Sequence, residues 1–203
     1  IAEALNTATV KSLTGSHLKL PAGRIEILAD ARSHQYADAL GVAVGGLAAG
    51  ASVAMAESDS TTLARLGNFA NDRDGDVVIS DLLVDANAED INQAKSVAGS
   101  GGLIAGNASV ASTLTKGSAL AQIGDSVEIA MRNLAVNAEY RAIFGTRANS
   151  VNAALAGASG AGGENRVLAN SQASIRDNSQ LAAQKDLIVT ANNNIFSHHL
   201  GAA

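Results

Sequence analysis

A five-residue motif recurs four times along the chain, at residues 25–29, 82–86, 134–138 and 187–191. The first positions of successive copies lie 57, 52 and 53 residues apart. In each copy the first, third and fifth residues are apolar, and the fourth is usually polar (Asp85, Asn137, Thr190). A period of two residues is typical of a β-strand with one buried face. The spacing predicts a repeat of about 53 residues built from such strands.

Two further motifs recur between these strands. A Gly-Gly-Leu block at residues 45–54 returns at 101–111 with one inserted Asn, and more weakly at 154–160. Residues 161–166 break the apolar pattern, and we expect an outward loop there. A Leu-Ala-x-Leu-Gly-type motif lies at residues 63–67, 120–124 and 173–175. Because three motifs recur in a fixed order, we divide the single segment 1–203 into a partial repeat, three full repeats and a second partial repeat. Their bounds are 1–24, 25–81, 82–133, 134–186 and 187–203.

Strands are favoured over helices because the Gly-Gly-Leu and Ala-Gly steps would cost about 1 kcal/mol per Gly inside a helix. Each repeat offers five or six short strand candidates separated by Gly, Asn, Asp and Ser, with few hairpin signals. Repeats that cannot bury their own faces must stack on their neighbours. The sequence therefore predicts an all-β, right-handed parallel β-helix (β-solenoid). Coils of roughly 18–27 residues would place two or three coils in each repeat, and the sequence does not choose between two and three.

The composition fits a thin stack. Hydrophobic residues make up 47% of the chain but aromatic residues only 2%, and there are 20 Gly. Equivalent positions would form internal columns, and Gly would form the corners. Asn87 and residues 192–194 are predicted at turns, where Asn bonds to local backbone. The predicted small-residue column is Ala29, Ala86, Ala138 and Ala191, and the predicted β-branched column is Ile27, Val84, Val136 and Val189.

These motifs resemble the repeat regions of large bacterial exoproteins, the filamentous haemagglutinin-like proteins and the leukotoxin-type filamentous adhesins. The likeness is carried by the Leu/Ile-x-Val-x-Ala strands, the Gly-Gly-Leu-x-Ala-Gly-x-Ser-Val-Ala blocks and the Ala-x-Ile/Leu-Gly steps, and it covers nearly the whole chain. The resemblance implies a right-handed β-helix shaft, export across the outer membrane and a role in attachment or aggregation. The family's N-terminal secretion domain and C-terminal anchor are not found in this sequence.

No constellation of residues predicts catalysis, cofactor binding or a metal centre. His17, His34, His198 and His199 are dispersed, and the adjacent pair would point to opposite faces of a strand. The cluster at residues 71–76 resembles a calcium loop, but the position of the terminal Glu of an EF-hand is occupied by Leu. We expect a solvated turn there, and weak calcium binding near Asp72, Asp74 and Asp76 stays open. We therefore expect no enzyme and no cofactor.

Two further stretches match functional segments only in part. Residues 41–46 resemble a phosphate loop, but no Lys-Ser/Thr pair follows. Residues 39–56 are apolar and uncharged, long enough to raise the question of a membrane span. Their Gly and Ala content makes them weakly hydrophobic, and the equivalent stretch carries Lys95, Asn107 and several Ser. No membrane span is expected.

Charge and composition limit the classes of partner that we expect for this chain. The net charge is −5, no run of basic residues occurs and there is no Cys, so nucleic-acid binding and disulfides are not expected. The leading prediction is a structural shaft of a secreted, extracellular or cell-surface fibre or filamentous adhesin. Its expected partners are neighbouring repeats, a second copy stacked end to end, or a cell-surface or matrix ligand. The alternative is a β-helix polysaccharide-degrading enzyme or a carbohydrate-binding module.

Overall fold

The computed structural model describes residues 1–20, 23–72, 79–198 and 200, and these residues form β-strands and no helix. All strand pairs are parallel. The predicted all-β class and parallel pairing are therefore confirmed. The strands are β1 (Ala2–Leu13), β2 (Lys19–Leu20), β3 (Gly23–Val44), β4 (Leu47–Leu66), β5 (Asn71–Asp72), β6 (Ile79–Ile123), β7 (Glu128–Ile175) and β8 (Gln180–Ser197).

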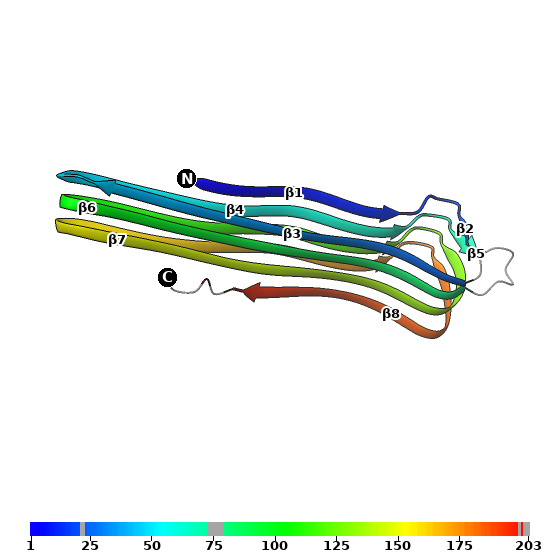
Figure 1. The fold of residues 1–203 in the computed structure, drawn as a ribbon. Coiled ribbons are helices and arrows are strands. Elements are labelled where there is room, and N and C mark those ends of the chain that lie inside the picture. Colours follow the sequence, from blue (N-terminus) through cyan, green and yellow to red (C-terminus); the bar gives the residue numbers. More distant parts are fainter. Residues whose placement is uncertain (21–22, 73–78, 199, 201–203) are drawn as a thin grey trace.

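The long strands form two facing layers (Figure 1). Layer A contains β3, the first halves of β6 and β7, and β8. Layer B contains β1, β4 and the second halves of β6 and β7. The chain crosses between the layers through tight turns at one end, and through broader connections that include β2 and β5 at the other (Figure 1). We call these the narrow end and the broad end.

The strand register shows that the chain passes through each layer only once per repeat. Paired residues are 52 positions apart between β1 and β4, as in Ala2 and Ala54, and 57 apart between β3 and β6, as in Ile25 and Leu82. The prediction of two or three coils of 18–27 residues per repeat is therefore wrong. The five or six predicted short strands are replaced by two arms of about 20 residues. Backbone hydrogen bonds to neighbouring strands hold Gly, Asn and Ser within these arms despite their preference for turns.

The predicted internal columns are present. Ala29 pairs with Ala86, Ala86 with Ala138 and Ala138 with Ala191. The column of Ile27, Val84, Val136 and Val189 runs beside it in the same register. The third motif also stacks on itself, because Leu66, Ile123 and Ile175 lie in one column. Repetition in the sequence therefore corresponds to direct stacking of like side chains.

Three local predictions are corrected. Asn107 is not an insertion. It pairs with Gly50, 57 positions away, and the same separation joins Val44 to Gly101, so the register does not change across the turn. Asn87 and residues 192–194 lie within β6 and β8 rather than at turns. Residues 161–166, which break the apolar pattern, continue as a strand in β7 rather than as a loop. In each case stacking on a neighbouring strand decides the backbone conformation.

Side-chain size falls along the interior from the broad end to the narrow end. Leu82, Val84 and Ile123 are fully buried near the broad end, whereas Ala94 and Ala111 belong to a separate cluster of alanines. At the narrow end the backbones approach closely, since a Cβ on Gly41 of β3 would lie 2.5 Å from the carbonyl oxygen of Ala51 in β4. The space between the layers narrows toward the turns, which explains the small residues and few aromatics.

The broad end contains a stacked left-handed corner. His17, Phe69, Ser126 and Asn178 have φ between 54° and 58°. Their amides form a ladder in which the N–H of His17 donates to the carbonyl of Asn68 and that of Phe69 to the carbonyl of Asp125, both at 2.9 Å. The rings of His17 and Phe69 stack with centroids 4.7 Å apart. These contacts offset the roughly 1–2 kcal/mol that a non-glycine residue costs in this conformation.

The first full repeat, residues 25–81, is longer than the preceding partial repeat near this corner. Leu20 pairs with Asp72 at an offset of 52, whereas Gly23 pairs with Ile79 at 56. The additional residues coincide with the acidic cluster for which weak calcium binding stays open. Arg73, Asp74 and Asp76 lie outside the described residues, so the structure does not test that prediction.

Candidate functional site

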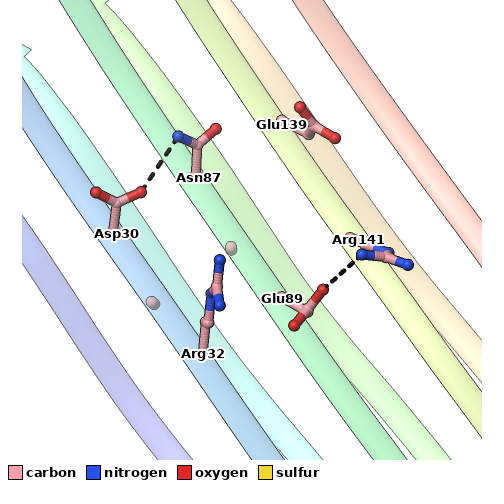
Figure 2. Close-up of a pocket in the computed structure, with 8 residues that line it drawn as sticks. Asp30, Arg32, Asn87, Glu89, Glu139 and Arg141 are labelled. Carbon is pink, nitrogen blue, oxygen red and sulfur yellow. Dashed lines mark hydrogen bonds and ion pairs between the residues drawn. The ribbon is translucent and has the colours of Figure 1, made fainter.

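Charged side chains line a shallow groove on the outer face of layer A (Figure 2). They belong to two neighbouring columns of the sheet, because outward residues two positions apart on a strand lie side by side. One column contains Asp30, Asn87 and Glu139, and the other contains Arg32, Glu89 and Arg141. These side chains rise from β3, β6 and β7, which are neighbours in the sheet (Figure 2).

Most of these groups are held by their neighbours. The Asn87 Nδ2 donates to Asp30 Oδ1 at 3.2 Å and to Asp85 Oδ2 at 2.7 Å. Arg141 Nη1 lies 3.0 Å from Glu89 Oε2 in a surface ion pair (Figure 2). Such contacts between exposed groups are each worth little, but here they join successive repeats.

The edge strand β8 adds to the same surface. Asn194 Nδ2 donates to Glu139 Oε1 at 2.8 Å, and the Arg141 guanidinium lies 5.2 Å from the ring centroid of Phe196. Partial burial and the negative charges of Asp30 and Glu139 raise the pKa of Asp85, against the hydrogen bond from Asn87.

The groove presents charged and amide groups that can bind a polar ligand. Within the described part of the chain, Arg32 makes no hydrogen bond or ion pair, and its guanidinium faces the groove beside Asp30 and Glu89 (Figure 2). An unpaired arginine among carboxylates and amides can bind hydroxyl or acidic groups of a polar ligand. Among the described residues no nucleophile is paired with a base here, and no group of three potential metal ligands occurs.

A second polar cluster lies between the layers and was not predicted. Asp90 is 1% exposed and accepts hydrogen bonds from Tyr140 at 2.5 Å, from Ser60 at 2.6 Å and from Ser33. Burial and the adjacent carboxylate raise the pKa of Tyr140 far above its ordinary value, so its hydroxyl remains a donor. Gly117 leaves the space that the Tyr140 ring fills. The sequence did indicate that Asp90 is buried, because it continues the alternation of inward-facing residues 82, 84, 86 and 88.

Smaller hydroxyl and amide groups continue this buried polar row toward the narrow end. Asn92 Nδ2 donates to Ser58 at 2.8 Å and to Thr115 at 2.5 Å. Ser96 donates to Ser52 at 3.0 Å and accepts from Ser109 at 2.8 Å. These bonds connect layer A with layer B, so they fix how the layers face each other.

The residues singled out from the sequence do not converge. His17 lies in the broad-end corner, His34 is exposed on layer A and His198 donates its backbone N–H to Phe144 at the end of β8. His199 is outside the described residues. The glycine-rich residues 41–46 and the uncharged residues 39–56 form the end of β3, a tight turn and the start of β4.

The described residues form no helix with the length and hydrophobicity needed to cross a bilayer. No protein-family model, curated protein or solved structure matches the chain.

Proposed function

We propose that this chain is a segment of a right-handed parallel β-solenoid that forms the shaft of a secreted surface fibre or filamentous adhesin. The observation that carries the proposal is the column register, in which the same inward residue types recur through all repeats. Right-handedness is the expectation for crossovers between parallel strands. The motif resemblance to filamentous adhesins supports the extracellular assignment and a role in attachment or aggregation.

The outermost strands support growth of the stack. Leu187 and Val189 on β8 occupy inward positions, yet they are 59% and 44% exposed. The equivalent Leu134 and Val136 one strand away are almost completely buried. An unpaired strand edge with exposed apolar side chains is a template for another strand. Further repeats or a second copy on this edge would complete the column.

The shaft proposal predicts unusual dimensions. One passage of about 53 residues advances the stack by a single strand spacing of about 4.8 Å, while arms of about 20 residues make it roughly 70 Å wide. The assembly would be a broad, thin ribbon rather than a slender rod.

Negative-stain electron microscopy of the purified chain, followed by fibre diffraction, tests this proposal. We expect ribbons with an axial reflection near 4.8 Å. Compact particles at every protein concentration, with β8 protected in hydrogen exchange, would contradict it.

A carbohydrate-binding function is the second candidate. Tyr36 and Phe196 are 49% and 48% exposed on the same face as Arg32 and Arg141, and aromatic and arginine side chains suit sugar rings and acidic groups. Calorimetry with acidic polysaccharides, together with an assay for released reducing ends, distinguishes binding from cleavage. Phe196→Ala should weaken any binding, whereas Leu168→Ala on layer B should leave it unchanged.

A further inference from the structure

The narrow end of the molecule carries no charge in three consecutive repeats. Residues 39–56, 96–115 and 148–163 contain no Asp, Glu, Lys or Arg, and each stretch includes a tight turn. The ion pairs of Asp38 with Lys95 and of Glu57 with Lys116 mark its border. Charge is therefore segregated along the long strands rather than mixed over the surface.

The outer side of layer B is apolar over most of this region. Its outward positions from residue 47 to 53 of β4, from 104 to 110 of β6 and from 156 to 162 of β7 contain only Gly, Ala, Val, Leu and Ile. Leu47 is 80% exposed and Ile104 is 57% exposed. We call this surface the flat face, and it consists of Leu47, Ala49, Ala51, Val53, Ile104, Gly106, Ala108, Val110, Ala156, Ala158, Gly160 and Gly162.

We propose that the flat face binds the flat face of a second copy of this chain, so that two molecules associate side by side. The Ala and Gly columns leave an even surface on which another sheet can pack at about 10 Å. The larger residues form two rows, Leu47 beside Ile104 and Val53 beside Val110. The Ala and Gly positions between these rows can receive the larger side chains of the partner. This inference goes beyond the shaft proposal, because it concerns the flank and requires neither export nor an adhesive ligand.

The chemistry of the flat face favours a second copy over other occupants. A polar partner would lose its hydrogen bonds to water against twelve positions whose side chains offer none in return. Surfaces that lie in a bilayer interface usually combine aromatic residues with Lys or Arg, and residues 39–56, 96–115 and 148–163 contain neither. An identical face matches in chemistry and in strand spacing, and it gives a closed two-fold contact.

The area of the flat face sets the expected strength of association. Each outward position covers roughly 32 Å² of sheet, so twelve positions cover about 400 Å² per copy. Stable interfaces bury about 800 Å² per partner. Association of this segment should therefore be weak, and it should strengthen as repeats are added, because every repeat contributes another row.

Cysteine cross-linking provides a direct test, because the chain contains no Cys. Ala108→Cys places a thiol at the centre of the flat face, and Ala153→Cys is a matched control at an exposed outward position of layer A. Under mild oxidation we expect disulfide-linked dimers from Ala108→Cys in at least tenfold excess over the control. End-to-end stacking cannot produce this result, because Ala108 lies on β6 in the interior of the sheet.

A charge-exchange experiment gives the second readout. Ala108→Lys and Ala108→Glu should each sediment as monomers at concentrations where the unaltered chain dimerises, and an equimolar mixture should regain dimers. Circular dichroism confirms that both variants retain strand structure. Equal cross-linking of the two Cys variants, or oligomers unchanged by Ala108→Lys, would overturn the proposal. So would a monomeric chain that floats with phosphatidylcholine vesicles through the same residues.

Discussion

Asp90 illustrates how one inward polar residue constrains the whole cross-section. Its carboxylate accepts hydroxyl hydrogen bonds from Ser33 and Ser60 of the preceding repeat and from Tyr140 of the following one. The donors come from both layers. A buried carboxylate is tolerated only when such donors are in place. The cluster therefore fixes the register between repeats and the alignment between layers at one point.

Removing one donor from this cluster should lower stability. For Tyr140→Phe we expect a loss of roughly 1.5–3 kcal/mol in the free energy of unfolding, because a hydrogen bond to a buried charged group disappears. Urea unfolding followed by circular dichroism measures the effect. Tyr36→Phe is the matched control, since its hydroxyl bonds to Asp38 at the surface. A similar loss in both variants would contradict the buried role of Asp90.

Gly117 is required by the ring that lies against it. A Cβ at this position would overlap the Tyr140 ring, which is completely buried. Gly117→Ala should therefore cost roughly 1–3 kcal/mol through overpacking. Gly160→Ala, where a Cβ meets nothing within 4 Å, should be neutral or slightly stabilising. Thermal melts compare the two, and equal effects would argue against this packing.

The raised pKa of Asp85 predicts a pH-dependent effect. Because the pKa is higher in the folded state, the contribution of this group to stability is full below its unfolded pKa and is lost as the pH rises through the folded value. Asp85→Asn should therefore stabilise the fold at pH 7 by roughly a few tenths of a kcal/mol, since the site is partly solvated. Urea titrations should show little gain at pH 3. An equal gain at both values would exclude ionisation as the cause.

At the scale of the elements, the contribution of an inward side chain to stability depends on its place in the stack. Val136 in β7 and Val189 in β8 occupy the same column and differ only in their neighbours. Val136 has strands on both sides and is fully buried, whereas Val189 lies on the edge strand. Hydrophobic stabilisation follows the area removed from water, so the two should differ in energy.

Paired substitutions measure this difference. Val136→Ala should lower the free energy of unfolding by about 2 kcal/mol, the cost of lost methyl groups and a partly unfilled cavity. Val189→Ala should cost less than about half of that. If chains associate through β8, the cost of Val189→Ala should rise with protein concentration, because the edge position then becomes buried.

At the scale of the whole molecule, backbone pairing between strands joins residues 52–57 positions apart, about one repeat. The free energy of unfolding then approximates a sum of contributions from the individual strands and from the contacts between neighbouring strands. β6 and the first half of β7 have partner strands on both sides, whereas β1, β3, β8 and the second half of β7 have one. Long separations between partners also predict slow folding, because chain closure precedes each pairing.

Hydrogen exchange should report this gradient. We expect the slowest amide exchange in β6 and in residues 134–142 of β7, and the fastest in β1, β3, β8 and the second half of β7. Mass spectrometry of peptides from a time course provides the measurement. Uniform protection across all strands at low protein concentration would contradict the expectation that each strand is stabilised mainly by its immediate neighbours.

The repeat, the inward phase and the columns could be read from the sequence alone. Alternation of two residues depends only on local strand geometry, and a column requires only that equivalent positions stack. The Ala29 and Ile27 columns were predicted correctly for this reason. The Asp90 cluster was missed although its phase was readable, because its donors come from other repeats and from the opposite layer.

The number of passages per repeat was decided by the tertiary structure. Glycine, Asn and Ser within the arms carry local preferences for turns, and from the sequence they divide each repeat into short strands. Hydrogen bonds to strands on both sides keep Asn87 and Asn107 extended, and the pairing of Gly50 with Asn107 does the same for Gly50 where the space between the layers narrows. Where the chain turns is thus determined by its neighbours 52–57 residues away, and no local window of sequence contains that information.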